Sequence, residues 1–248
     1  MQFIILGASP GLPQLNKHLS SLYVHHQGKH LLFDCGEGCS HQLLRYSLDK
    51  DLLDAIIISH YHPDHFSGIF MLIQMLYLQQ RQKTLHLYLP EREDDFEALL
   101  HLQYTFRQRL SYRLVIHPME DLPLHHPQIK IQSTNHLHGY SQIIQDLQLS
   151  NTMRSWAFQI GESPRSLVYT SDIQQTDCIT SFLDCHTIII DALHTEASQI
   201  TSLAELPIPR VILTHGSSEE LSEWMTNHAP GSFEFAEEGK HYYINDKD

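Results

Sequence analysis

The chain has 248 residues, of which 42% are hydrophobic and 18% charged, and its formal net charge at pH 7 is −13. This composition can fill a sizeable core, which excludes an intrinsically disordered chain and fits one large domain. The excess of 29 acidic over 16 basic residues repels polyanions on average, so binding to nucleic acid would need a local basic patch.

Short apolar and β-branched runs along the chain predict a series of strands, with fewer helices between them. The predicted strands are residues 2–6, 21–26, 30–33, 55–58, 84–88, 113–116, 129–133, 155–160, 166–169, 187–190, 210–213 and 241–244. The predicted helices are residues 39–46, 68–80, 91–110, 200–206 and 219–227. In each half, hairpin-like pairs of strands precede strand–helix units, which indicates an α/β sandwich of sheets covered by helices.

Two predicted segments have a distinctive distribution of charged and polar residues. Residues 91–110 begin with acidic residues and end with Arg107 and Arg109, which suits the dipole of one long helix. Residues 140–154 are polar and amphipathic, and they form either a lid or a surface insertion. No internal repeat and no linker rich in Pro, Gly or Ser divides the sequence, so we expect a single domain over residues 1–248.

The cysteines and the apolar runs bear on location. Cys35, Cys39, Cys178 and Cys185 form no Cys-x-x-Cys pair, so we expect reduced thiols in a cytoplasmic protein. The apolar run at the N-terminus has no basic residues before it and ends in glycine, unlike a signal peptide. The longest apolar stretch, residues 66–78, falls short of the roughly 20 residues that a membrane span needs.

The most specific feature is a cluster of four metal-binding residue types that follows the strand at residues 55–58. Residues 59–65 read Ser-His-Tyr-His-Pro-Asp-His, which brings together His60, His62, Asp64 and His65. Imidazole nitrogen and carboxylate oxygen are the usual ligands of a hydrolytic Zn²⁺. One ion needs about three protein ligands, so four here, with others from the fold, predict two ions. Chance clustering among 20 histidines explains pairs better than it explains this arrangement.

These residues resemble the metallo-β-lactamase superfamily, and within it the ribonuclease Z-like phosphodiesterases. His-Tyr-His-Pro-Asp-His at 60–65 matches the signature of the superfamily, and Gly-Ala-Ser-Pro-Gly-Leu-Pro at 7–13 resembles the opening of ribonuclease Z. Leu-Leu-Phe-Asp-Cys-Gly-Glu-Gly at 31–38, followed by a predicted helix, does so as well. The resemblance extends to about residue 217 and implies a four-layer αββα sandwich with its ligands at strand ends.

The resemblance also implies the remaining ligands. His136 or His138 should follow the strand at 129–133, and His136 fits better because the apolar pattern ends just before it. Asp172 and His215 each follow a predicted strand, although alone they would be read as a capping Asp and a turn His. By analogy with the family, His60, His62 and His136 would hold one zinc ion. Asp64, His65 and His215 would hold the other, and Asp172 would bridge the two.

Two such cations imply a metal-bridging hydroxide that cleaves phosphodiesters near neutral pH. Mn²⁺ or Fe²⁺ could replace zinc, because the same ligands accept all three. Asp64 is expected to take part in catalysis as well as in binding. Asp34 and Glu196 would support the site from behind, although Asp34 could instead be a turn carboxylate. His194 is the candidate general acid, although it lies one residue earlier than the histidine in the His-Glu-Ala-Thr segment of the family.

The substrate remains open between two phosphodiesterase hypotheses. Residues 80–124 contain no glycine and lack the basic arm of enzymes that process precursor transfer RNA, which favours small or cyclic phosphodiesters. Arg107, Arg109 and Arg113, interleaved with aromatic residues, favour instead an RNA 3′ end bound with help from a homodimer partner. A carboxylic ester, lactone or thioester hydrolase is a more distant alternative. A non-catalytic zinc scaffold is disfavoured, because all seven candidate ligands are intact.

Overall fold

A computed structural model describes residues 1–49, 51–228 and 231–245 of the chain. The chain divides into two compact units. The first unit comprises Met1–Leu122 with Glu238–Tyr243, and the second comprises Pro123–Glu237 with the residues from Ile244 onward. The single domain expected over residues 1–248 therefore stays a prediction, and each unit is described by itself.

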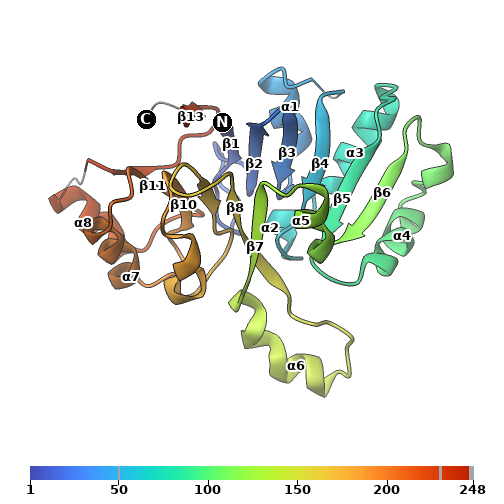
Figure 1. The fold of residues 1–248 in the computed structure, drawn as a ribbon. Coiled ribbons are helices and arrows are strands. Elements are labelled where there is room, and N and C mark those ends of the chain that lie inside the picture. Colours follow the sequence, from blue (N-terminus) through green and yellow to red (C-terminus); the bar gives the residue numbers. More distant parts are fainter. Residues whose placement is uncertain (50, 229–230, 246–248) are drawn as a thin grey trace. The chain divides into compact units, whose positions relative to one another are not determined.

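The first unit contains a seven-stranded sheet in the order β13-β1-β2-β3-β4-β5-β6 (Figure 1). Its strands are β1 (Gln2–Gly7), β2 (Ser21–His26), β3 (Lys29–Phe33), β4 (Leu53–Ile57), β5 (Leu85–Leu89), β6 (Leu114–Pro118) and β13 (His241–Tyr243). The strands from β13 to β3 pair antiparallel, and those from β3 to β6 pair parallel. An antiparallel hairpin thus precedes the strand–helix units, as the sequence predicted.

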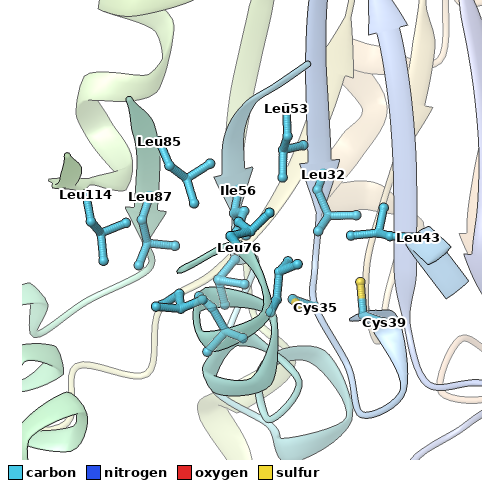
Figure 2. Packing of buried hydrophobic residues seen from close by; sticks show 14 of the residues in the cluster. Leu32, Cys35, Cys39, Leu43, Leu53, Ile56, Leu76, Leu85, Leu87 and Leu114 are labelled. Carbon is cyan, nitrogen blue, oxygen red and sulfur yellow. The ribbon is translucent and has the colours of Figure 1, made fainter. Parts of the chain in front are cut away.

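Helices of the first unit cover one face of this sheet. They are α1 (Cys39–Arg45), α2 (Pro63–Phe66), α3 (Ile69–Leu78) and α4 (Glu93–Leu102), with 3₁₀ turns at Arg107–Arg109 and Met119–Asp121 and the short α5 (Leu122–His125) at its boundary. Leu32 of β3, Ile56 of β4 and Leu87 of β5 are fully buried, and they pack in one cluster with Leu76 of α3 and Leu43 of α1 (Figure 2). The side chains on one face of the sheet and on the apolar face of α3 therefore form one core.

The second unit contains a six-stranded sheet in the order β12-β11-β10-β9-β8-β7. Its strands are β7 (Ile129–Thr134), β8 (Ser155–Ile160), β9 (Leu167–Tyr169), β10 (Thr187–Asp191), β11 (Arg210–Thr214) and β12 (Phe233–Phe235). Its helices are α6 (Ser141–Asp146), α7 (Ala197–Ser202) and α8 (Glu219–His228), with 3₁₀ turns at His136–Tyr140, Thr176–Phe182 and Leu203–Glu205. β7, β8 and β9 pair antiparallel, and β9 to β12 pair parallel, so the order of the first unit is repeated.

The prediction of one helix over residues 91–110 was wrong. The helix ends at Leu102, because Tyr104 adopts a left-handed conformation with φ of 55°. The backbone N–H of Tyr104 donates to His101 O at 3.0 Å, and that of Thr105 donates to Leu100 O at 2.9 Å. These two bonds form a Schellman motif, which satisfies the last helical carbonyls and turns the chain away. Arg107 and Arg109 therefore lie on a separate 3₁₀ turn and do not complement the dipole of α4.

Residues 140–154, which were expected to form a lid or a surface insertion, contain α6, and this helix lies apart from the strands of the second unit in Figure 1.

All four cysteines lie in the described part of the chain, and none of them forms a disulfide. Among the residues described, every helix is too short or too polar to cross a lipid bilayer.

Candidate metal centre

The motif of the first unit lies where β4 ends and α2 begins. Pro63 occupies the start of α2, where its missing N–H costs no hydrogen bond, and His62 precedes it in an extended conformation. Asp64 and His65 therefore lie in the first helical turn, and His60 lies in the segment before it. The ring centroid of His60 is 4.7 Å from that of His62 and 4.2 Å from that of His65. The change from strand to helix thus brings the imidazole rings of the motif close together.

Asp34 supports two of these imidazoles from behind. It is fully buried, and its carboxylate accepts hydrogen bonds from His65 Nδ1 at 2.8 Å, from Ser59 N at 2.8 Å and from Ser59 Oγ at 3.0 Å. Because the Ser59 hydroxyl donates to Asp34, its oxygen accepts from His60 Nδ1, which lies 3.0 Å away. One carboxylate therefore fixes the tautomer of both His60 and His65.

The consequence for metal binding is direct. An imidazole that carries its proton on Nδ1 has its lone pair on Nε2, which is the form that binds a divalent cation. His65 Nε2 lies 3.4 Å from Asp64 Oδ2, so a second candidate ligand adjoins that lone pair. This support by Asp34 is the arrangement commonly found behind histidine ligands of metals.

The candidate residues of the second unit follow strands whose ends meet at one edge of the sheet. Asp172 follows β9, Asp191 ends β10 and His215 follows β11. These three strands are parallel neighbours, so their carboxyl ends lie together. His136 follows β7, the strand at the far side of the same sheet. Topology therefore brings together residues that are up to 79 positions apart in the sequence, His136 and His215.

Three imidazole nitrogens converge on a single oxygen, Asp172 Oδ2. His215 Nε2 lies 3.3 Å from it, His136 Nε2 lies 3.4 Å from it and His194 Nδ1 lies 3.7 Å from it. Asp172, His136 and His215 are all buried. His138, the alternative to His136, is exposed.

His194 is oriented by a residue that the sequence analysis missed. Its Nδ1 donates to Asp191 Oδ2 at 2.8 Å, and its backbone N–H donates to Asp191 Oδ1 at 3.1 Å. Thr195, which follows, is buried and donates its hydroxyl to Ile173 O. Glu196, the residue that precedes α7, is exposed. Its side chain forms no hydrogen bond with His194 in the described structure.

A sequence signal for Asp191 existed. The strand at residues 187–190 ends in a carboxylate in the same way as the strand that precedes Asp172. The match of this segment to a family motif predicts the supporting role for Glu196 instead. Asp191 is fully buried, and together with Asp172 and His194 it forms a group whose potential ligand atoms lie within 4.8 Å of one another.

The residues present fit divalent zinc. The donors are imidazole nitrogens and carboxylate oxygens without a thiolate, which is the usual set at hydrolytic sites. Metal–ligand bonds of about 2.0–2.1 Å at a tetrahedral angle place neighbouring ligand atoms about 3.3 Å apart. The separations from Asp172 Oδ2 to His215 and His136, 3.3 and 3.4 Å, match this spacing and exceed an ordinary hydrogen bond. The separation between His65 Nε2 and Asp64 Oδ2 in the first unit, 3.4 Å, matches it too.

Comparison with known proteins places the chain in a family. A family model described as "Anti-Pycsar protein Apyc1" matches residues 1–242. The ribonuclease Z of Methanosarcina acetivorans is 29% identical over 165 residues, which are 66% of this chain and 50% of that protein. The chain thus matches about half the length of this curated relative.

Solved structures show the fold. The short form of human tRNase Z has a TM-score of 0.73 and 20% identity, with coverage of 99% of this chain and 100% of that chain. The metallo-β-lactamase fold protein YhfI from Bacillus subtilis has a TM-score of 0.72 and 20% identity, with coverage of 97% and 98%. The predicted αββα fold of the metallo-β-lactamase superfamily, with its likeness to ribonuclease Z, is therefore confirmed.

Proposed function

Since the chain belongs to the family of the anti-Pycsar protein Apyc1 and has the metallo-β-lactamase fold, we propose that it is a dinuclear, zinc-dependent phosphodiesterase for small or cyclic phosphodiesters. The observation that carries this proposal is the approach of two imidazole nitrogens, His136 Nε2 and His215 Nε2, to Asp172 Oδ2 at separations typical of ligands that share an ion. A buried carboxylate with candidate imidazole ligands beside it, such as that of Asp172, is suited to bind two ions at once.

We infer that the candidate ligands belong to one metal site. One ion would be held by His60, His62 and His136, the other by Asp64, His65 and His215, with Asp172 shared. Neither unit alone offers the roughly three ligands per ion that two ions need, whereas the seven residues together do. The order of these residues along the chain, each after a strand, also agrees with that of ribonuclease Z-like proteins.

The side chains would divide the work of phosphodiester cleavage. Two divalent cations, when bound, would supply a nucleophilic water near neutral pH and neutralise negative charge on the phosphoryl oxygens. Asp34 would keep His60 and His65 in the tautomer that binds a cation. His194, whose Nδ1 is held by Asp191, would use Nε2 to give a proton to the leaving oxygen. Its side chain is 37% exposed, so a substrate can reach it.

The environment of Arg107 favours a small substrate over RNA. Its guanidinium donates to Glu97 Oε2 at 2.8 Å and to Leu114 O at 2.8 Å, so this arginine of the candidate basic patch is already engaged. The net charge of −13 weakens general attraction to a polyanion further. The second candidate, cleavage of RNA 3′ ends with help from a homodimer partner, is supported by the matched ribonuclease Z relative.

Three further points belong to the same proposal. Mn²⁺ or Fe²⁺ could occupy the site in place of Zn²⁺, because imidazole and carboxylate accept all three. We also propose that the protein acts as a homodimer. A cytoplasmic location would agree with four cysteines that form no disulfide in the described structure.

A matched pair of variants tests the proposal. His136→Ala removes a proposed ligand, whereas His138→Ala removes an exposed imidazole two residues away. We expect His136→Ala to lose bound metal and turnover of cyclic mononucleotides, and His138→Ala to keep both, as measured by elemental analysis and product chromatography. Full turnover in His136→Ala would contradict the assignment. Cleavage of an RNA with a 3′ extension, but of no small phosphodiester, would favour the second candidate.

A further inference from the structure

A loop of the first unit carries two leucines that are almost fully exposed. Residues 9–18, here called the leucine loop, are closed at the base by a backbone hydrogen bond from Ser9 N to His18 O of 2.9 Å. Leu12 is 80% exposed and Leu15 is 98% exposed. Loops held by a rigid scaffold often carry the residues that contact a ligand.

The same loop lies against the candidate metal site. A Cβ atom added to Gly11 would lie 3.4 Å from Asp64 Oδ2, so the backbone of the loop lies next to this carboxylate. Gly11 leaves open the space that a side chain would fill. A phosphodiester that approaches Asp64 would therefore meet the loop that carries Leu12 and Leu15.

The base of the loop is held by a residue from the other end of the chain. Glu238 Oε1 accepts hydrogen bonds from His18 N at 2.8 Å and from Ala8 N at 3.2 Å. Glu238 Oε2 lies 2.8 Å from His18 Nδ1 and pairs with it. One carboxylate thus binds both ends of the loop.

Glu238 is itself firmly placed. The next residue, Gly239, has φ of 80° and donates its N–H to Ile5 O at 2.9 Å. A Cβ atom on Gly239 would overlap the ring of Tyr46, so only glycine fits here. β13 then pairs with β1, which fixes the segment to the sheet. The position of Glu238 is therefore set by backbone contacts that do not depend on the loop.

We propose that Glu238 is a positioning residue that holds the leucine loop against Asp64, so that Leu12 and Leu15 contact the organic group of a phosphodiester substrate. This inference rests on the proposed function and assigns the residues that would contact the organic side of its substrate. The two leucines supply the apolar contact that ligand sites combine with a few polar groups.

Two nitrophenyl esters and limited proteolysis test this inference. Thymidine 5′-(p-nitrophenyl phosphate) and methyl p-nitrophenyl phosphate share a leaving group but differ in the nucleoside. The variants are Glu238→Ala, Glu238→Gln, the double variant Leu12→Ser with Leu15→Ser, and the exposed control Glu205→Ala. Lys17 is an exposed residue of the loop. Trypsin cleavage after it is followed by mass spectrometry and measures loop opening independently of phosphodiesterase activity.

We expect Glu238→Ala to be cleaved after Lys17 about tenfold faster and to raise KM for the thymidine ester about tenfold, with kcat nearly unchanged. Glu238→Gln should restore most of both, because its amide can still accept from the two N–H groups. The double leucine variant should raise KM for the thymidine ester and leave the methyl ester unchanged.

The opposite results overturn the inference. Equal cleavage after Lys17 in Glu238→Ala and Glu205→Ala would show that Glu238 does not hold the loop. An unchanged KM in the double leucine variant would show that the leucines do not contact the substrate. If the metal-loaded wild type cleaves neither ester, the proposed function fails, and proteolysis alone decides whether Glu238 holds the loop.

Discussion

Replacing Asp34 with asparagine should weaken metal binding without unfolding the protein. The residue has φ of 58°, a left-handed conformation that asparagine tolerates well, so Asp34→Asn adds no backbone strain. The asparagine oxygen can still accept from Ser59 N. Its NH₂ group, however, would then face His65 Nδ1, which now donates to the carboxylate at 2.8 Å. Two donors cannot pair, so His65 would move its proton to Nε2 or turn away.

The size of the effect follows from these contacts. A proton on His65 Nε2 blocks the atom proposed to bind the ion. Loss of such support behind a histidine ligand typically costs 10–100-fold in metal affinity, or about 1.4–2.8 kcal/mol. Weakening the charge-assisted hydrogen bonds of a buried carboxylate should also lower the stability of the metal-free protein by about 1–3 kcal/mol.

Metal affinity is measured by competition with a chromophoric chelator, and the stability of the metal-free protein by urea denaturation. The matched control is Asp54→Asn, because Asp54 also accepts from a backbone N–H, that of His30 at 2.9 Å, and pairs with Lys83 at 3.1 Å. We expect the control to lose stability but to keep metal affinity. Equal metal affinity in Asp34→Asn and wild type would refute the reasoning.

Three other substitutions test individual contacts of the structure. Asp191→Asn should slow cleavage of alkyl phosphodiesters about 10–100-fold and p-nitrophenyl esters much less, because His194 loses its acceptor; equal slowing would remove His194 as general acid. Arg81→Leu should cost about 3 kcal/mol in urea denaturation, because the fully buried guanidinium donates to Lys83 O, Leu53 O and Thr84 O; a loss under about 1 kcal/mol would contradict this. Burial and His25 hold the pKa of His30 below its usual value of 6.5, so the unfolded chain binds the proton more readily. Stability should therefore fall as the pH drops below about 6.5, and less so in His30→Gln, as shown by denaturation at several pH values.

The sequence predicted most of the fold because its strands are apolar runs with clear ends. The hairpin-first order in both units followed from these runs, and the structure confirms it. β12 (Phe233–Phe235) was missed because three residues carry too little pattern to be recognised. The end of α4 was missed because a non-glycine residue, Tyr104, adopts the left-handed conformation that usually signals glycine.

The part of the candidate site that is contiguous in the sequence could be predicted from the local pattern, and the part that depends on distant contacts could not. The cluster from His60 to His65 is contiguous, so the sequence alone showed it. The approach of His136 and His215 to Asp172 depends on the pairing of strands far apart in the chain, and only the resemblance to a family indicated it. Asp191 could have been marked as a candidate because it ends an apolar strand, but its contact with His194 depends on how the chain turns after β10, which spacing does not reveal.

The most direct test of the proposed dinuclear phosphodiesterase combines two measurements on one sample. Metal content per chain is determined by elemental analysis of wild type and Asp172→Asn, and turnover of bis(p-nitrophenyl) phosphate is measured with the same preparations. We expect two zinc ions per wild-type chain with metal-dependent turnover, and loss of both metal and turnover in the variant. A wild type that binds no metal, or a variant that retains full turnover, would contradict the assignment of Asp172 as the shared ligand of a catalytic metal pair.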